Sequence, residues 1–389
     1  MYTESEVMDF IKEEDVKFIR LAYFDLAGKQ KNVSILAGEL ENVFKNGFSF
    51  DASAVDGFEK PNKSDLFLHP DPSTLSVLPW RPSAGKVVRM FCDIKHPDGT
   101  PYKKDSRYLL RTAVEKAKKE FGLTLDFGTE FEFYLFKLDE NGNPTKIPFD
   151  NAGYMDIAPE DKGENIRREI DFTLEQMGIT TESSHHEEGP GQNEVDFRYS
   201  DALTAADNAS TFKWIVRTKA AANGLYADFE PKPLQDKPGN GMHINISTSK
   251  KELMPSILAG IMEHLPEITY YLNPTRNSYD RLGEHKAPKY IAWGHENRST
   301  VIRVPAAKGN ERIEIRSSDA GTNPYIAFTL LLHAAMDGIR KNMDPLEPCE
   351  ENLFDRETAE KYNYRAIPDT LNTAKDLAEK SQFIKEIFK

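Results

Sequence analysis

Two glutamates alternate with two aromatic residues in the segment 128–133, which reads GTEFEF. Successive side chains of a β-strand point to opposite faces, so Glu130 and Glu132 would share one face while Phe131 and Phe133 share the other. Carboxylates that converge in this way can bind divalent cations. The segment therefore predicts a strand with one apolar face and one face that carries chemistry.

The same alternation occurs in three later segments, namely 194–198 (EVDFR), 243–247 (HINIS) and 312–316 (RIEIR). A single strand of this kind usually belongs to a sheet whose charged side faces water. Four such strands favour a shared site, because their polar faces carry glutamates and a histidine rather than the lysines and threonines of a solvated face.

The motif His185-His186-Glu187 adds one more carboxylate to this set. The predicted metal ligands are Glu130, Glu132, Glu187, Glu194, His243 and Glu314. Carboxylate oxygens with one imidazole and no thiolate suit Mg²⁺ or Mn²⁺ better than a structural zinc ion. This is more ligands than one hydrated magnesium ion normally takes, so we predict at least two ions.

The overall composition limits the class of protein. The chain has 389 residues, 39% of them hydrophobic, and a formal net charge of -13. This indicates a soluble globular protein of two domains, and it argues against nucleic-acid binding or an anionic membrane surface. The two cysteines lie far apart and form no zinc or disulfide pattern. The acidic N-terminus does not resemble a signal peptide, and the apolar segment 326–336 is too short to span a bilayer, so we expect a cytoplasmic protein.

Turn residues and hydrophobic periodicity divide the chain into elements. We expect short strands up to about residue 100, then a helix that begins after Asp105 as N-cap and ends at Gly122. Further helices are expected near 164–177, 201–223, 254–271 and 322–339.

No phosphate-binding loop of the GxxxxGK[ST] or GxGxxG type accompanies these elements. The residues expected to bind phosphate instead are Arg281, Arg298, Arg303, Arg312 and Arg316. Arginine forks bind phosphates and carboxylates bidentately, and metal ions combined with arginines are what phosphoryl transfer requires. Surface salt bridges are the usual role of an isolated arginine, but Arg312 and Arg316 alternate with Glu314 on one strand.

Together these motifs resemble the glutamine synthetase family over nearly the whole chain. In the family's order the chain contains FDAS at 50–53, TEFEF at 129–133, HE at 186–187, GQNE at 191–194, KP at 232–233, GMH at 241–243, NSY at 277–279, NRS at 297–299, RIEIR at 312–316 and NPY at 323–325. One such motif alone would be a weak signal. Their ordered agreement across both halves argues against coincidence.

The resemblance implies an α+β protein with an N-terminal β-grasp domain, residues 1–100. Residues 101–389 would form the glutamine synthetase catalytic domain, a curved antiparallel sheet flanked by helices. It implies a ligase of nitrogen metabolism that forms glutamine from glutamate, ATP and ammonia through γ-glutamyl phosphate. It also implies a ring-shaped homo-oligomer whose subunits share active sites. The chain stops at Lys389, before the last helical segment of many relatives, which leaves open whether rings stack.

The resemblance also implies a role for each site residue. One metal would be held by Glu132, Glu187 and Glu194, and the other by Glu130, His243 and Glu314. Glutamate would be held by Gly239, Arg281 and Arg316, and ATP with its phosphates by Ser247, Arg298, Arg303 and Arg312. Asp51 would reach the active site of a neighbouring subunit and help to deprotonate ammonium.

The chain departs from the family in the flap that covers the ammonium site. The family has Glu-Ala-Pro where this chain reads EHKAP at 284–288, so Lys286 stands in place of the flap glutamate. A lysine ammonium about 4 Å from bound ammonium would oppose it by roughly 4 kcal/mol at an effective dielectric near 20. Either Glu284 takes the role of the flap glutamate, or ammonia is not the usual acceptor.

Two other functions remain open at this stage. The first is a γ-glutamyl ligase that uses a larger amine, such as one with a negative group that pairs with Lys286. The second is a non-catalytic structural or nitrogen-sensing relative. The intact set of metal ligands argues against the second, because clustered buried charge is costly to keep without a use.

Overall fold

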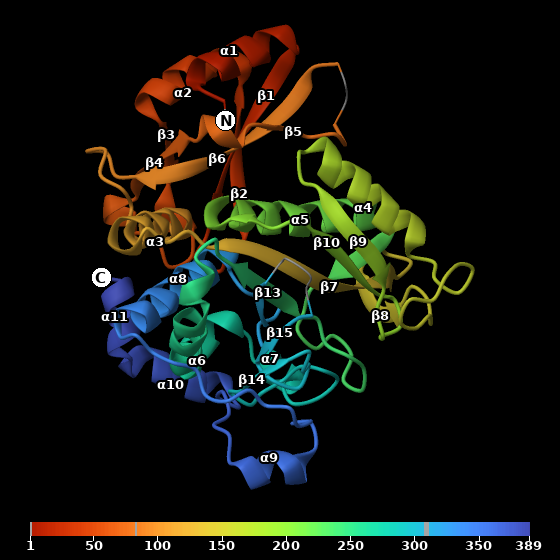
Figure 1. The fold of residues 1–389 in the computed structure, drawn as a ribbon. Helices are drawn as coiled ribbons and strands as arrows, with labels where there is room; N and C mark the ends of the chain where they lie inside the picture. The colour runs from red at the N-terminus through yellow and green to blue at the C-terminus, as the bar shows by residue number, and fades with distance from the viewer. Residues whose placement is uncertain (1, 82–83, 307–310) are drawn as a thin grey trace. The chain divides into compact units, whose positions relative to one another are not determined.

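The computed structural model describes residues 2–81, 84–306 and 311–389, which form two compact units (Figure 1). The first unit comprises residues 1–112 with 173–179, and the second comprises residues 113–172 with 180–389.

The first unit contains a six-stranded sheet in the order β2-β1-β6-β4-β3, with β5 beside β6. Its strands are β1 (Val16–Phe24), β2 (Gln30–Leu36), β3 (Phe48–Asp51), β4 (Asp65–Pro70), β5 (Ser76–Val77) and β6 (Lys86–Lys95). The strands β1 and β6 pair in parallel, and the other pairs are antiparallel.

Two helices of this unit, α1 (Glu4–Glu13) and α2 (Leu40–Asn46), were not predicted, so the expectation of strands alone was wrong here. Helix α1 carries a capping box, in which the backbone N–H of Glu6 donates to Thr3 Oγ1 at 3.3 Å and the backbone N–H of Thr3 donates to Glu6 Oε2 at 2.7 Å. Its residues Val7 and Ile11 are buried in the core of the unit. The sequence TESE at 3–6 is the signal that could have identified the helix.

The second unit contains a ten-stranded sheet in the order β14-β15-β16-β13-β7-β10-β9, and β8, β11 and β12 also pair with β7. Its strands are β7 (Asp126–Leu138), β8 (Pro144–Pro148), β9 (Thr181–His186), β10 (Gln192–Phe197), β11 (Ser200–Asp201), β12 (Leu225–Asp228), β13 (Met242–Ser247), β14 (Trp293–His295), β15 (Ile302–Val304) and β16 (Ile313–Ile315). The pair β14–β15 is parallel and the other pairs are antiparallel. The expected α+β fold with a mainly antiparallel catalytic sheet is confirmed.

The predicted helices are present, with bounds within two residues of those expected. The helices after residue 100 are α3 (Ser106–Phe121), α4 (Glu164–Gln176), α5 (Ala202–Ala222), α6 (Met254–Leu272), α7 (Ser278–Arg281), α8 (Pro324–Arg340), α9 (Arg356–Tyr362), α10 (Leu371–Lys380) and α11 (Gln382–Ile387). Asp105 caps α3 as expected, because its Oδ1 accepts the backbone N–H of Arg107 at 3.0 Å, and Gly122 ends the helix with φ +58. None of the helices in the described part of the chain combines the length and apolar character needed to cross a lipid bilayer.

The apolar face of β7 packs on helices of the second unit. The ring of Phe131 lies 5.3 Å from that of Phe212 on α5, and the ring of Phe127 lies 4.3 Å from that of Phe328 on α8. The alternation of the strand then turns Glu130 and Glu132 to the opposite face. Burial of the aromatic side chains therefore positions the acidic ones.

Helices α6 and α8 lie side by side in the second unit (Figure 1) and approach closely at two glycines. A Cβ added to Gly338 would lie 2.0 Å from the carbonyl oxygen of Ser256, and one added to Gly260 would lie 2.3 Å from that of Ala334. Only glycine allows the two backbones to come this near.

We expect Gly338→Ala to destabilise the second unit by about 1–3 kcal/mol, because the added methyl group must push the two helices apart. The unfolding midpoint in urea should fall accordingly. Gly38→Ala is the matched control, since a Cβ there meets no atom within 4 Å. Equal midpoints for the two variants would contradict this account of the helix contact.

Candidate active site

The pairing of strands around β7 brings the predicted acidic residues together. Glu194 of β10 stands opposite Glu132 in the register, and Asp196 stands opposite Glu130. On the other side of β7, His243 of β13 is the partner of Glu130. Side chains that are directly opposite on one face lie close together, so these strands assemble one acidic surface.

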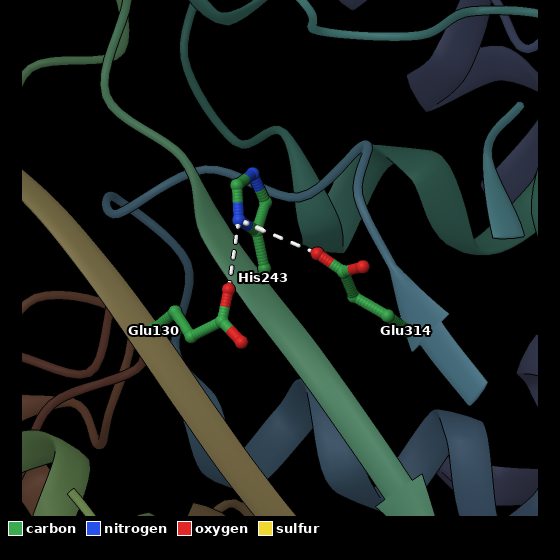
Figure 2. A group of neighbouring side chains, drawn as sticks. All are labelled: Glu130, His243 and Glu314. Carbon is green, nitrogen blue, oxygen red and sulfur yellow. Dashed lines mark hydrogen bonds and ion pairs between the residues drawn. The ribbon is translucent and has the colours of Figure 1, made fainter. Parts of the chain in front are cut away.

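Glu130, His243 and Glu314 form the first cluster on this surface, as Figure 2 shows. His243 Nδ1 lies 3.3 Å from Glu130 Oε2 and 3.7 Å from Glu314 Oε1. Their candidate ligand atoms all lie within 4.8 Å of one another. Two carboxylates and an imidazole at this spacing can hold a divalent cation.

Cationic neighbours stabilise the charged carboxylates of this cluster. Burial opposes ionisation of Glu130, but the hydrogen bond and charge of His243 outweigh it and lower the pKa of Glu130 to about 2. Glu314 is also buried, yet Arg316 and His243 lower its pKa. Arg303 Nη1 donates to Glu314 Oε2 at 2.7 Å, and Arg316 Nη1 donates to Glu314 Oε1, so each oxygen of this carboxylate accepts from an arginine.

The second cluster consists of His185, Glu187 and Glu194. His185 Nδ1 lies 3.5 Å from Glu187 Oε1, and its Nε2 lies 3.6 Å from Glu194 Oε1. Glu132, the register partner of Glu194, lines the same cavity, and its Oε2 accepts the backbone N–H of Gly241 at 2.6 Å. The expected group of Glu132, Glu187 and Glu194 thus lies together, with His185 as an addition.

In the second cluster, burial and the repulsion between carboxylates raise the pKa values instead of lowering them. Burial and the charge of Glu132 raise the pKa of Glu187 to about 8, and burial with Asp196 and Glu132 raises the pKa of Glu194. Crowded carboxylates of this kind gain most from a bound cation. The oxygen and imidazole donors fit Mg²⁺ or Mn²⁺.

Two residues of this acidic surface, His185 and Asp196, were not predicted from the sequence to belong to the site. His185 was only the first residue of a motif noted for Glu187. Asp196 was read as part of a strand face, but it lines the cavity, and burial with the charge of Glu130 raises its pKa to about 6. Its position two residues after Glu194 was the signal.

A third group, Asp150, Asp161 and His186, also has the residue types of a metal site. Here the polar atoms are already paired. His186 Nε2 bonds to Asp150 Oδ1 at 2.9 Å, His186 Nδ1 bonds to the carbonyl of Glu187 at 2.6 Å, and Arg167 Nη1 donates to Asp161 Oδ1 at 3.2 Å. This buried network holds the backbone at Glu187, and it needs no ion.

Two cavities of the second unit adjoin the clusters. The larger has a volume of about 460 Å³ and is lined by the second cluster, by Glu130 and His243 of the first cluster, and by Arg281, Arg298, Arg303, Arg312 and Arg316. The smaller, about 200 Å³, is lined by Asn245, Ser247 and Tyr199 among others. Glu130, Asp196 and Arg312 line both. The predicted ATP residue Ser247 is therefore in the smaller cavity, and the predicted glutamate residues are in the larger one.

The predicted glutamate residues Gly239 and Arg281 lie in close contact. A Cβ at Gly239 would lie 2.2 Å from the carbonyl oxygen of Pro231 and 2.9 Å from Arg281 Cγ, so the position requires glycine. Arg281 is 3% exposed and donates to the carbonyls of Ser317 at 3.0 Å and Arg316 at 3.2 Å. Its charge is thus fixed in one place at the cavity wall.

The turn at 283–287 contains Glu284 and Lys286, the two residues expected at the flap. The backbone N–H of Gly283 donates to the carbonyl of Ala287 at 2.7 Å. Lys286 lines the larger cavity. Glu284 is exposed, and its carboxylate acts on Lys232, where it opposes the lowering of the lysine pKa by burial. Of the two residues, the structure thus places Lys286 at the cavity.

Asp51 belongs to the first unit, whereas all residues that line the two cavities belong to the second. It ends β3, and its Oδ1 accepts hydrogen bonds from Ser53 N at 2.9 Å and Ser53 Oγ at 2.6 Å. These bonds lower the pKa of Asp51, so it is a charged acceptor at neutral pH.

Comparison with known families decides the identity of the chain. A family model described as glutamine synthetase, catalytic domain, matches residues 103–389, and one described as glutamine synthetase, beta-Grasp domain, matches residues 15–97. The chain belongs to the glutamine synthetase family. The predictions of family and fold class are confirmed.

Individual relatives of this family match nearly the full chain. A glutamine synthetase of Methanosarcina mazei is 44% identical over 99% of this chain and 90% of its own length. One of Clostridium saccharobutylicum is 43% identical over 91% and 83%, and one of Staphylococcus aureus is 41% identical over 99% and 91%. The predicted function, a glutamate–ammonia ligase of the glutamine synthetase type, is thereby confirmed, and a larger amine or a non-catalytic role is not favoured.

Two solved structures are also similar to the chain over nearly its full length. A structure titled "GmaS/ADP complex-Conformation 1" has a TM-score of 0.89 and 26% identity, covering 98% of this chain and 92% of that one. A Plasmodium falciparum glutamine synthetase has a TM-score of 0.86 at 24% identity, covering 100% and 95%, which shows the shared fold. Glutamine synthetases generally use ATP and divalent metal ions, with glutamate and ammonia as substrates.

We expect the affinity for Mn²⁺ to rise as the pH increases toward about 8, the pKa of Glu187. Below that pH the cation must displace a proton from a ligand carboxylate, and above it the ligand is already charged. Calorimetric titrations in buffers of different ionisation enthalpy would measure the protons released. Glu187→Gln should weaken the pH dependence without removing it, because the pKa of Glu194 is raised as well. Equal affinity of the wild type at low and high pH would contradict the expectation.

Proposed function

We propose that the protein forms glutamine at the acidic surface around β7, through γ-glutamyl phosphate, with the residues of the second unit in the roles given below. The observation that supports this most is the juxtaposition of two carboxylate–histidine clusters with five arginines in adjoining cavities. We assign the β-grasp domain to residues 1–100 and the catalytic domain to residues 101–389.

The metal ligands follow from the two clusters. We assign Glu130, His243 and Glu314 to one ion, and Glu132, Glu187 and Glu194 to the other. Mg²⁺ or Mn²⁺ bound there would neutralise phosphate charge and polarise the phosphoryl group that is transferred. The chain itself holds the ligands in place, because neighbouring strands fix them and Arg303 holds Glu314.

The arginines divide between the two substrates. We assign ATP and its phosphates to Ser247, Arg298, Arg303 and Arg312, which line the two cavities. Glutamate is assigned to Gly239, Arg281 and Arg316. Arg298 is exposed in the larger cavity, so its guanidinium group is available to spread the charge that develops during phosphoryl transfer.

Two chemical steps follow. A carboxylate is a poor electrophile at neutral pH, so the side chain of glutamate first takes the terminal phosphoryl group of ATP. Ammonia then attacks the acyl phosphate and expels phosphate. Because ammonium must lose a proton before it can attack, a carboxylate near the acceptor is required, and we assign this role to Asp51.

Asp51 lies in the N-terminal unit, and we propose that it completes the site of a neighbouring subunit in a ring-shaped homo-oligomer. Its charged side chain ends a strand and is exposed, which leaves it accessible to a second chain. Both cysteines are buried and unpaired, which is consistent with a reducing compartment, and we propose the cytoplasm.

Activity measurements test the proposed site directly. ADP release should require glutamate and rise when ammonium is added, and without ammonium the acyl phosphate should cyclise to 5-oxoproline. Glu130→Ala and Glu314→Ala should each lower kcat by about two orders of magnitude or more, because each removes a metal ligand. Glu140→Ala, an exposed glutamate in the same unit, is the control. Near-normal turnover in both site variants would refute the assignment.

Mixed oligomers test the shared site. An Asp51→Ala subunit and a Glu314→Ala subunit should each be inactive alone, but co-assembly should restore part of the activity, because some interfaces then combine two intact residues. Mass spectrometry of differently tagged subunits would show that mixing occurred. Mixed rings without any recovery would show that Asp51 does not serve a neighbour's site.

A further inference from the structure

Lys286 forms an ion pair with Glu188, a residue 98 positions earlier in the chain. Both side chains line the larger cavity, and they are 52% and 33% exposed. The backbone N–H of Glu188 donates to Glu187 Oε2 at 3.0 Å, so Glu188 has a defined position beside that proposed metal ligand.

Further contacts hold the lysine at this place. Its Nζ lies 5.7 Å from the centre of the Tyr154 ring, which also lines the cavity, and an aromatic face attracts a cation at this distance. The carbonyl of Lys286 accepts a hydrogen bond from Arg316 Nη2 at 3.4 Å. The half-exposed ammonium group of Lys286 is therefore part of the cavity wall.

A fixed lysine ammonium in this cavity would repel an ammonium ion that enters it. The repulsion depends on whether a compensating charge is nearby, because an ion pair presents almost no net charge at a distance greater than its own length. Glu188 is that compensating charge, since its carboxylate is in direct contact with Lys286 Nζ.

We propose that Glu188 is a positioning residue that neutralises Lys286 and thereby lets the cavity accept ammonium. This inference rests on the proposed function, since it concerns the acceptor of the same reaction. Glu188 acts through Lys286 and makes no contact with the reacting atoms. The lysine that replaces the flap glutamate is then compatible with ammonia as acceptor.

The test compares a cationic and a neutral acceptor. In Glu188→Gln, Lys286 is left uncompensated, and the KM for ammonium should rise about tenfold, a value reduced by solvent screening from the full Coulomb effect. Hydroxylamine is uncharged at neutral pH, so its KM, measured through γ-glutamyl hydroxamate, should be unchanged. The KM values for glutamate and ATP should also be unchanged.

Rescue distinguishes a charge effect from a loss of structure. The double variant Glu188→Gln/Lys286→Met removes both charges and should return the KM for ammonium to the wild-type range. The exchanged pair Glu188→Lys/Lys286→Glu should do the same. Glu120→Gln is the matched control, because Glu120 pairs with Arg340 at 2.8 Å with similar exposure, 38% and 49%.

The outcomes separate the two proposals. If the wild-type protein forms no glutamine, the proposed function itself fails. If the wild type is active but Glu188→Gln leaves the KM for ammonium unchanged, or raises the KM for hydroxylamine equally, only the role of Glu188 is overturned. Failure of the double variant to restore the KM would also overturn it.

Discussion

The repulsion among carboxylates on one face of the sheet around β7 is the constraint on which the rest of the site depends. The chain offsets it unevenly. Around Glu130 and Glu314, His243 and two arginines supply positive charge, and the pKa of Glu130 falls to about 2. In the ion pairs of the described residues, Glu187 and Glu194 have no arginine partner. The pKa of Glu187 rises to about 8. Positive side chains of the protein thus offset the negative charge of the first cluster more than that of the second.

The aromatic face of β7 stabilises the sheet against the repulsion among these carboxylates. Phe131 and Phe127 pack on α5 and α8, and burial of each side chain contributes about 1.5–3 kcal/mol, which helps to offset the repulsion among the carboxylates. Polar networks support the loops in turn. The ring of His186 bonds to the carboxylate of Asp150 and to the backbone carbonyl of Glu187, and thereby holds the backbone beside Glu187. These hydrogen bonds satisfy the imidazole without a metal ion.

How much of this could be predicted from the sequence depended on the range of each interaction. The period of two in GTEFEF and RIEIR indicated which side chains share a face. Hydrophobic periodicity found α3, α4, α5, α6 and α8, but α7, α9, α10 and α11 were not predicted. Helix α1 was missed because its apolar stripe is short, although its capping box is local. The role of His186 as a structural group was not accessible, because Asp150 and Asp161 come from a separate loop.

The turn at 283–287 shows why residue-by-residue transfer from a family has a limit. Considered alone, Lys286 predicts poor use of ammonium, because only its own charge enters the argument. Its partner Glu188 lies in a different loop, and no local pattern links two positions 98 residues apart. Electrostatic free energies depend on the sum of charges within a few ångströms, so a single exchanged charge has no defined effect until its neighbours are known. In this protein the neighbour, Glu188, has the opposite sign and contacts Lys286 in the same cavity.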